Sequence, residues 1–252
     1  MPDSLAALVL AAGEGRRLRP LSRLRPKALC PVAGRSLVDL AIAKVGAVVG
    51  TSAVAVNVHH GREQFVRHFD GRVHLSVEEP VALGTAGAVA QLRPWLDGRP
   101  VLVVNADTWH TAALAPLVAD WAGTRVRVLI CGSAGEELGP ASRVLGSVLP
   151  WTEVLRFPHA PWGLWEASWR DRLADGSLEV ATAEADFVDC ATPADYLSAN
   201  LSASGGASVV GEGARVWGSV VRSVVWPGGV VGEGETLVDA IRVGERLTVA
   251  TR

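Results

Sequence analysis

The feature that most restricts the fold is a short apolar run that passes directly into a glycine-rich turn. Leu5 to Ala12 is long enough for one buried strand, and residues 13–18 follow it with the sequence Gly-Glu-Gly-Arg-Arg-Leu. Glycines let backbone N–H groups approach a polyphosphate because no Cβ intervenes. Arg17 adds a planar cationic fork, and Lys27 adds a point charge from the same loop. The segment predicts a phosphate-binding loop, although a Gly-x-Gly turn alone is also typical of a plain tight connection.

The longer run around this turn is more specific than its glycines. It reads Leu-Ala-Ala-Gly-x-Gly-x-Arg-Leu-x-Pro-Leu and then Pro-Lys-x-Leu-x-Pro-Val. It resembles the signature of the sugar-1-phosphate nucleotidyltransferases, which condense a nucleoside triphosphate with a sugar phosphate and release pyrophosphate. The glycine spacing differs from that of a Walker A loop and of a dinucleotide fingerprint. The resemblance implies that Arg17 binds the β- and γ-phosphates and that Lys27 bridges the α-phosphate and the incoming phosphate. It also implies nucleotide contacts from Leu10, Ala11, Ala12, Gly13 and Gly15.

Composition bounds the class of protein. With 252 residues, of which 49% are hydrophobic, the chain can bury one large core and still form a small appendage. The formal net charge of -2 gives no electrostatic footprint for nucleic acid or anionic membrane. Cys30, Cys131 and Cys190 lie far apart without a Cys-x-x-Cys pair, which is typical of buried thiols in a reducing cytosol. No basic segment precedes Leu5 and no other run is long enough to span a bilayer, so we expect a soluble cytoplasmic protein.

Strand and helix patterns alternate along the first half of the chain. This rhythm predicts a parallel sheet with crossover helices, in which ligands bind beyond the carboxyl ends of the strands. We therefore expect an α/β fold with a Rossmann-like mixed, mainly parallel sheet flanked by helices. His59 and His60 fall near that edge, where capping and loop packing are commoner roles than metal ligation. We expect helices over 36–49, 62–69, 114–122 and 157–176, and strands over 53–58, 74–77, 100–104, 125–131 and 143–149.

A second motif follows the strand over 74–77. Glu78 and Glu79 end that strand, and residues 83–88 read Leu-Gly-Thr-Ala-Gly-Ala. This segment resembles the base-reading segment of the same family, which implies that Glu79 faces the nucleobase and that Gly84 and Thr85 contact the nucleotide. A carboxylate only accepts hydrogen bonds, so it favours the N–H edges of guanine, uracil or thymine, and hence GTP or UTP/dTTP. The alternative is that both glutamates are solvated charges.

Two aspartates are candidates for metal binding. Asp107 follows the β-branched run 100–104 and Asn105-Ala106, where the family carries Asn-Gly-Asp and binds Mg²⁺. Asp189 begins a segment that resembles the family's Asp-x-Gly-Thr-Pro-x-x-Tyr-Leu-x-Ala-Asn, and it aligns with the second metal-binding aspartate. The resemblance therefore implies a Mg²⁺ cofactor, although a family glycine is Ala106 in one motif and Ala191 in the other. Helix capping is the alternative role for Asp107.

The middle of the chain departs from the family. Residues 132–140 stand where the best-known branch has a Val-Glu-Lys-Pro segment for the sugar phosphate, and they contain no lysine. The strand over 143–149 resembles the family's sugar-contacting strand, which implies sugar-phosphate contacts from Asn105, Gly146 and Arg143. Arg143 is alternatively a surface arginine. Trp162, Trp165 and Trp169 are spaced by three and four residues, which favours the buried or interface stripe of a helix over a ligand site. Their layout resembles the short branch that includes N-acetylmuramate-1-phosphate uridylyltransferases and mannose-1-phosphate guanylyltransferases.

After residue 207 the composition changes, and valine, glycine and glutamate predominate. Val210 and Val216 are six residues apart, as are Val225 and Val231, which is the period of a left-handed β-helix. About two coils fit, too few for a hexapeptide acyltransferase, and no histidine follows residue 200. We expect a catalytic domain over 1–203 and a short β-helix over 204–252, and the sequence leaves open whether its coils form a homodimer.

The motifs together predict a Mg²⁺-dependent sugar-1-phosphate nucleotidyltransferase. The nucleophile is a phosphate oxygen that is already anionic at neutral pH, so positioning and charge neutralisation suffice without a general base. The alternative is a catalytically weak or regulatory relative that binds nucleotide or sugar phosphate, which the missing Glu-Lys segment favours. Retention of Arg17, Lys27, Asp107 and Asp189 favours the enzyme.

Overall fold

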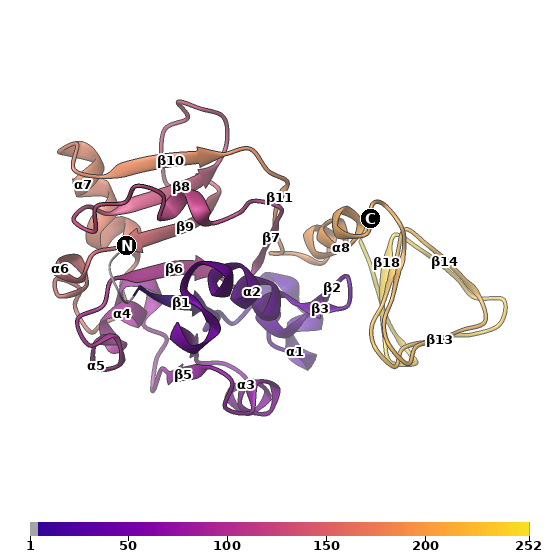
Figure 1. Ribbon diagram of the computed structural model, residues 1–252. Coiled ribbons are helices and arrows are strands. Elements are labelled where there is room, and N and C mark those ends of the chain that lie inside the picture. The colour runs from indigo at the N-terminus through magenta and orange to yellow at the C-terminus, as the bar shows by residue number, and fades with distance from the viewer. Residues whose placement is uncertain (1–4, 252) are drawn as a thin grey trace. The chain divides into compact units, whose positions relative to one another are not determined.

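A computed structural model describes residues 5–251 of the chain (Figure 1). Its packing divides the chain into two compact units, which we describe separately. The sheet unit comprises residues 5–13, Leu40–Ala106 and His110–Phe187. The coil unit comprises Glu14–Asp39, Asp107–Trp109 and residues 188–251. The division at residue 203 into a catalytic domain and a β-helix stays a prediction.

A seven-stranded sheet forms the centre of the sheet unit, in the order β10-β8-β9-β6-β1-β4-β5. The strands β9–β6 and β9–β8 pair antiparallel and the other neighbours pair parallel, which confirms the predicted mixed, mainly parallel sheet. The bounds are β1 Ala6–Leu10, β4 Val54–Val58, β5 His74–Val77, β6 Val101–Asn105, β8 Arg127–Cys131, β9 Val144–Leu149 and β10 Glu179–Ala183.

The register of the three central strands places their carboxyl ends side by side. Leu10 of β1 pairs with Asn57 of β4 on one side and with Asn105 of β6 on the other. The apolar residues before these ends are buried on both faces of the sheet, as is typical of parallel strands. Two asparagines therefore stand where the buried strands meet the loops.

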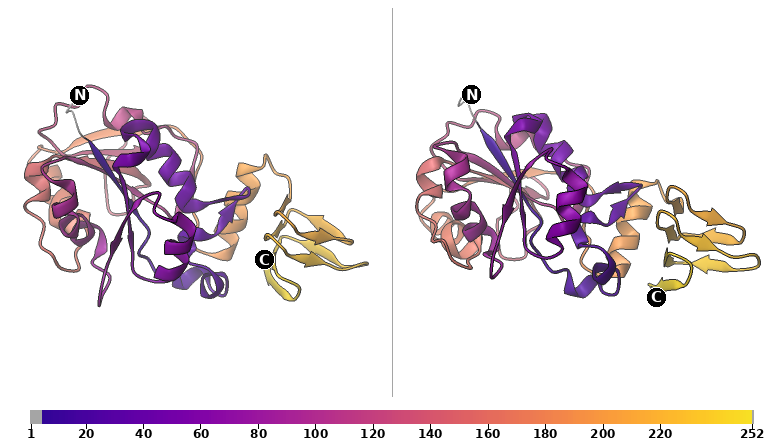
Figure 2. Two further views of the ribbon diagram at one scale, coloured as in Figure 1. Left: turned by 60° about the horizontal axis from the view of Figure 1, so that its bottom comes forward. Right: turned by 90° about the horizontal axis from the view of Figure 1, so that it is seen from below.

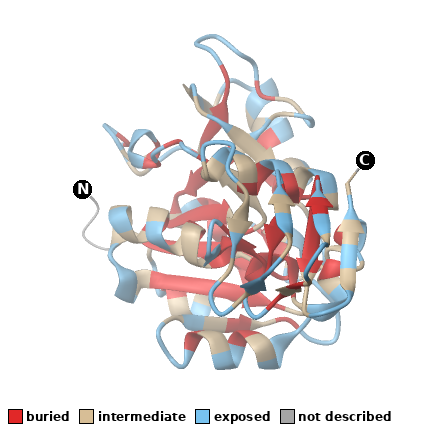
Figure 3. Ribbon diagram, turned by 90° about the vertical axis from the view of Figure 1, so that its right-hand side faces the viewer, coloured by how far each residue is buried: buried red, intermediate tan, exposed pale blue. Residues whose placement is uncertain are grey.

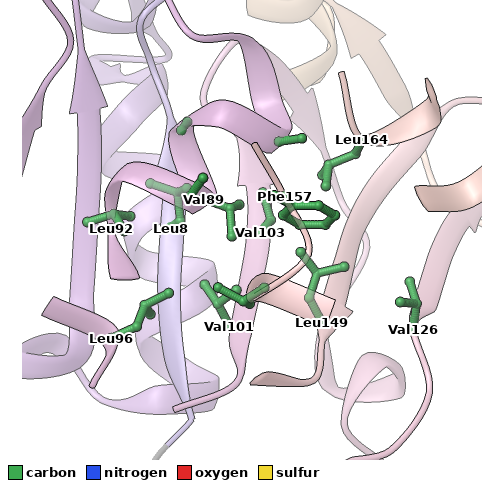
Figure 4. Packing of buried hydrophobic residues seen from close by; sticks show 14 of the residues in the cluster. Leu8, Val89, Leu92, Leu96, Val101, Val103, Val126, Leu149, Phe157 and Leu164 are labelled. Atoms are coloured by element: carbon green, nitrogen blue, oxygen red, sulfur yellow. The ribbon is translucent and has the colours of Figure 1, made fainter. Parts of the chain in front are cut away.

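One buried cluster forms part of the core of this unit. Leu8 of β1 and Val103 of β6 belong to it together with Val89 and Phe157 (Figure 4). Phe157 is 2% exposed, so its truncation to alanine should cost about 3–5 kcal/mol. The cluster fixes the strands from which the site residues project.

Helices and turns connect the strands, and two predicted helices are wrong in extent. The segment 114–122 holds only a 3-10 turn, because Asp120 has a φ of +54° and interrupts any helix. The helix predicted over 157–176 begins only at residue 165, because Pro158 and Pro161 precede it. The bounds are α2 Leu37–Val49, α3 Arg62–Phe69, α4 Gly84–Gln91, α5 Arg93–Leu96, η4 Ala115–Leu117, α6 Trp151–Val154, η5 Trp165–Trp169 and α7 Arg170–Ala174.

Short parallel strands stack at the C-terminal end of the coil unit (Figures 1 and 2). They form three narrow parallel sheets, β12-β15-β18, β13-β16 and β14-β17, in which successive strands start 15–17 residues apart, and β19 adds to the first sheet by pairing antiparallel with β18. Val225, Val231 and Leu237 form the buried interior, which matches the predicted six-residue period. The left hand of the winding stays a prediction. The bounds are β12 Val209–Val210, β13 Arg215–Val216, β14 Ser219–Val221, β15 Val224–Val225, β16 Val230–Val231, β17 Thr236–Val238, β18 Ala240–Val243 and β19 Leu247–Ala250.

Burial differs between the successive coils (Figure 3). Val225 and Val231 are buried, whereas Val210 of β12 is 50% exposed and Val216 of β13 is 37% exposed. Each of these two early strands has one strand neighbour within residues 5–251, β15 for β12 and β16 for β13. Within the described chain, the strands β12 and β13 of the first coil therefore have a strand neighbour on one side only.

Tyr196 ties the stacked strands to the rest of the coil unit. Its hydroxyl donates to the carbonyl oxygen of Pro31 and accepts from Trp226 Nε1 at 3.0 Å. Tyr196 lies on α8 (Pro193–Ala203), whose first turn is closed by a capping box between Thr192 and Asp195. The other short elements here are η1 Arg16–Leu18, α1 Leu21–Leu24, η2 Lys27–Leu29, β2 Pro31–Val32, β3 Arg35–Ser36, β7 Thr108–His110 and β11 Phe187–Asp189.

The cysteines are free and buried, as the sequence predicted. Within residues 5–251, no helix combines the length and the apolar character needed to cross a bilayer.

Candidate active site

In the coil unit, the ammonium group of Lys27 contacts two aspartates. Its Nζ donates to Asp107 Oδ2 at 2.8 Å and to Asp189 Oδ1 at 3.0 Å. The backbone supports this meeting, because the N–H of Cys190 donates to the carbonyl oxygen of Asp107 at 3.1 Å. The structure therefore brings together three residues that the sequence singled out from three distant segments. Their catalytic roles stay predictions.

The environment of Lys27 keeps it cationic. Burial alone would lower its pKa, but the charges and hydrogen bonds of Asp107 and Asp189 outweigh burial and raise the pKa above its ordinary value. The Lys27 side chain is 8% exposed, whereas those of Asp107 and Asp189 are 45% and 48% exposed. The cluster thus presents a fixed cation behind two accessible carboxylates.

Arg17 lies at the open side of this cluster. Its guanidinium is 3.8 Å from Asp189 Oδ2 and its side chain is 74% exposed. Such an exposed ion pair contributes little to stability. Arg17 is therefore free to reorient toward an anionic ligand.

Gly15 provides the space in which Lys27 is seated. Its φ is +65°, and a Cβ at this position would lie 3.0 Å from Lys27 Cβ and 3.3 Å from Ser22 Cβ. The hydroxyl of Ser22 donates to the Gly15 carbonyl oxygen at 2.7 Å and holds the turn. Glycine is thus required here by both backbone and packing. Gly13, in the sheet unit, is exposed and has open space beside its Cα.

The carboxylates of Asp107 and Asp189 suit a magnesium ion. Mg²⁺ prefers oxygen ligands and is commonly held by one or two carboxylates with water and substrate phosphates. Within residues 5–251 no group of three or more histidine, cysteine or acidic side chains is placed to hold a metal, so these two carboxylates would need water and phosphate oxygens as the remaining ligands. Neither Ala106 nor Ala191 is among the described residues with positive φ, so alanine fits where the family has glycine.

A buried relay in the sheet unit links the two predicted nucleotide-binding segments. The N–H of Ala11 donates to Asn57 Oδ1, the amide of Asn57 donates to Glu78 Oε1, and the N–H of Leu83 donates to Glu78 Oε2, each at 2.7 Å. Asn57 is 2% exposed and Glu78 is 0% exposed. The interpretation of Glu78 as a solvated charge is therefore wrong, because three hydrogen-bonded segments enclose it.

Sequence patterns alone assigned no role to Asn57 or Glu78. A polar residue ending an otherwise apolar strand was the available signal for Asn57. Glu79 next to them differs, because its side chain is 67% exposed and pairs with Arg62 Nη1 at 3.1 Å. Its contact to a base stays a prediction.

The small residues of the base-reading segment accommodate the protein's own chain. Gly84 has a φ of +66°, and a Cβ there would lie 2.7 Å from the carbonyl oxygen of Trp162. A Cβ on Gly87 would collide with the carbonyl oxygen of Ala160. Thr85 Oγ1 accepts from the N–H of Leu164 at 2.7 Å. The close approach at these positions is made by residues 160–164, and nucleotide contacts of Gly84 and Thr85 stay predictions.

A pocket of about 210 Å³ opens in the sheet unit. One water needs roughly 10–15 Å³ of such space, so the pocket is many times larger than a single-water cavity. Gly146 is buried in its wall, where a Cβ would press on Leu117 and Val104. Arg143 is exposed and is not part of the lining. The lining residues are Leu10, Thr85, Val103, Val104, Asn105, Val144, Gly146, Ser147, Gly163, Leu164, Trp165, Glu166 and Trp169.

Of the three tryptophans spaced by three and four residues, Trp165 and Trp169 contact the core and also line the pocket. Trp169 is 9% exposed and belongs to the buried cluster, as the stripe predicted, while Trp165 packs against that cluster. Both also line the pocket. Trp162 is 47% exposed. The sequence pattern favoured a purely structural stripe because helical spacing alone does not reveal a cavity.

Comparison with known proteins identifies the family. The family model described as "Nucleotidyl transferase" matches residues 6–136. The chain is 38% identical over 146 residues to the N-acetylmuramate alpha-1-phosphate uridylyltransferase of Caulobacter vibrioides, covering 53% of this chain and 60% of that protein. It is 37% identical over 108 residues to the enzyme of the same name from Neisseria meningitidis serogroup B, covering 41% of this chain and 47% of that protein. The chain thus spans less than two thirds of these relatives.

A solved structure has the same fold over nearly the whole chain. It is described as a mannose-1-phosphate geranyltransferase from Thermus thermophilus and superposes with a TM-score of 0.67 at 22% identity. The match covers 98% of this chain and 95% of that chain. At this identity the likeness concerns the fold alone.

Proposed function

The chain belongs to the nucleotidyl transferase family, and we propose that it joins a nucleoside triphosphate to a sugar 1-phosphate. The products would be a nucleoside-diphosphate sugar and pyrophosphate. The observation that carries the proposal is the buried ammonium of Lys27, held between Asp107 and Asp189 at 2.8 and 3.0 Å. The named activity of the two uridylyltransferase relatives supports it.

The proposed reaction is an in-line displacement at phosphorus. An oxygen of the sugar 1-phosphate forms a bond to the α-phosphorus, and the bond from that phosphorus to the β-phosphate oxygen breaks. Lys27 neutralises the α-phosphate and the incoming phosphate, and Arg17 binds the β- and γ-phosphates as they leave. Mg²⁺, held by Asp107 and Asp189, would supply further positive charge to the phosphate oxygens. No side chain needs to remove a proton, because the nucleophile is already anionic.

The nucleotide preference rests on the acceptor chemistry of Glu79. A carboxylate selects a base with an N–H donor on the ring itself, so GTP and UTP or dTTP are the proposed donors. The backbone of residues 10–13 and of Gly15, with Gly84 and Thr85, would contact the nucleotide. The uridylyltransferase names of two relatives support UTP as the first donor to test.

The sugar would occupy the pocket of the sheet unit. Asn105 and Gly146 line it, and its walls are mainly apolar and aromatic, as is usual for small-molecule sites. Arg143, exposed just before β9, is the remaining proposed contact to the sugar phosphate.

We also infer the cellular setting and the winding of the coils. Three free, buried thiols favour a reducing cytoplasm. The interior residues six apart at 225, 231 and 237 favour a left-handed β-helix. A homodimer through the coils stays a prediction that sedimentation can check.

A panel of substrates tests the function. Pyrophosphate release is measured with UTP, dTTP, GTP, ATP and CTP, each with several sugar 1-phosphates and with Mg²⁺ or EDTA. We expect release only with a sugar phosphate and Mg²⁺ present, and with a base that carries a ring N–H, which adenine and cytosine lack. The missing Glu-Lys segment favours one second candidate, a regulatory nucleotide-binding protein. Nucleotide binding without release across the whole panel would support that candidate.

A further inference from the structure

The pocket of the sheet unit carries one charged side chain, and that charge is negative. Nine of the thirteen lining residues are apolar or glycine, and Thr85, Asn105 and Ser147 are polar but neutral. No lysine, arginine or histidine is in the lining. Among the described residues that line this pocket, Glu166 is therefore the only charged one.

Glu166 lies on the π-helical turn η5, between the two tryptophans of the pocket wall. Such turns often occur at functional sites because the extra residue alters the direction of a side chain. The carboxylate folds over Gly163, since a Cβ at that position would collide with Glu166 Oε2. Across residues 5–251 no cation lies within ion-pair distance of this carboxylate, and Glu166 is exposed, so its charge is screened by solvent and not by a protein partner.

The chemistry of this lining restricts the ligand. Trp165 and Trp169 offer apolar faces to the C–H surface of a sugar ring or to the methyl of an acyl group. A carboxylate accepts hydrogen bonds from hydroxyl or amide N–H groups and repels a second carboxylate nearby. No cation in the pocket offsets that repulsion.

We propose that Glu166 determines sugar specificity, admitting sugar 1-phosphates with an uncharged ring, such as hexoses and N-acylhexosamines, and rejecting those with a carboxylate substituent. This rests on the proposed function and names its substrate class. It also separates this chain from the relatives named above, since N-acetylmuramate carries a lactyl carboxylate on the same ring.

Two sugar phosphates that differ only in that substituent provide the test. The ratio of kcat/KM for N-acetylglucosamine 1-phosphate to that for N-acetylmuramate 1-phosphate is measured with the donor nucleotide held constant. We expect the wild type to favour the uncharged sugar by at least tenfold. Glu166→Gln, which keeps the shape and removes the charge, should lower the ratio by about tenfold.

Two further variants separate the charge from packing. Gly163→Ala keeps the charge but displaces the carboxylate, so it should also lower the ratio. Glu184→Gln removes an exposed carboxylate outside the pocket and should leave the ratio unchanged. Far-UV circular dichroism and thermal midpoints confirm that each variant is folded.

The outcomes distinguish this inference from the proposed function. A wild type that prefers the acidic sugar, or a Glu166→Gln protein with the wild-type ratio, overturns the inference while the enzyme assignment stands. If no substrate pair releases pyrophosphate, the proposed function fails. The preference is then measured as the ratio of the calorimetric Kd values for the two sugar phosphates. Absence of binding to both sugars then overturns the inference too.

Discussion

The ammonium nitrogen of Lys27 lies 2.8 Å from Asp107 Oδ2, although 80 residues separate the two in the chain. Asp189, 162 residues from Lys27, completes the pair of carboxylates at 3.0 Å. Removing a cation from water is costly unless partners of opposite charge replace the solvent, and here both partners are also open to ligand. The arrangement keeps a positive charge in position before any phosphate arrives, which is the condition for electrostatic catalysis.

Replacing Gly15 should separate the effect of backbone strain from the effect on Lys27. Gly15→Ala and Gly34→Ala both force an alanine into positive φ, but only the former places its Cβ against Lys27. Each should lower the free energy of unfolding by about 1–2 kcal/mol. Only Gly15→Ala should lower kcat, by tenfold or more. Equal kcat values for the two variants would show that Gly15 does not position the lysine.

The buried relay predicts a loss of stability combined with weaker nucleotide binding. Glu78→Gln replaces one carboxylate oxygen by an amide nitrogen, so a donor faces either Asn57 or the N–H of Leu83. We expect the free energy of unfolding to fall by about 1–3 kcal/mol. The KM for the nucleoside triphosphate should rise more than kcat falls, because the relay holds Ala11 and Leu83 and not the reacting atoms. Glu79→Gln, at an exposed position, is the stability control and should change that free energy by less than about 0.5 kcal/mol.

Sequence motifs indicate the role of a residue when the evidence is local, and they do not indicate a role that depends on a partner distant in the chain. Lys27 and Asp189 stand in recognisable motifs, so the sequence alone predicts that both segments belong to the site. Their contact is seen only in the structure. Glu78 looked like its exposed neighbour, because its burial depends on Asn57, 21 residues earlier. The helical pattern does not single out Glu166, because the π-helical turn that places it breaks the 3.6-residue period on which the helix prediction relies.

Secondary structure was likewise predictable where the local pattern was strong and not where it was weak. Strands buried on both faces, such as Val101–Asn105, were found within a residue or two of their ends. The edge strand Glu179–Ala183 was missed, because its residues are only partly buried and carry a weak apolar pattern. The helix expected over 114–122 had a suitable pattern but could not continue through the positive φ of Asp120.

We expect His110 to make the stability of the fold sensitive to acid. Burial, followed by the nearby charge of Lys44, lowers the pKa of His110 from 6.5 to about 4 in the folded protein. Between those pH values the unfolded chain binds the proton and the folded chain does not, so stability is lost as pH falls from about 6.5 to about 4. The loss should reach up to about 3 kcal/mol.

Urea unfolding at pH 7 and pH 4.5 checks this contribution. The wild type should lose more stability between the two pH values than His110→Gln, in which the titrating group is absent. The exposed-histidine variant His60→Gln should behave as the wild type. Identical losses in all three proteins would rule out His110 as the cause.

The rate of pyrophosphate release by Lys27→Ala, compared with that by Arg23→Ala, tests the central claim most directly. Arg23 is an exposed cation of the same unit outside the cluster, so its loss controls for net charge. Both proteins should be folded by circular dichroism. We predict that kcat for Lys27→Ala falls by about a hundredfold or more, as on removal of a preorganised charge donor, while Arg23→Ala keeps the wild-type rate. Undiminished turnover in Lys27→Ala would contradict the assignment of this cluster as the catalytic site.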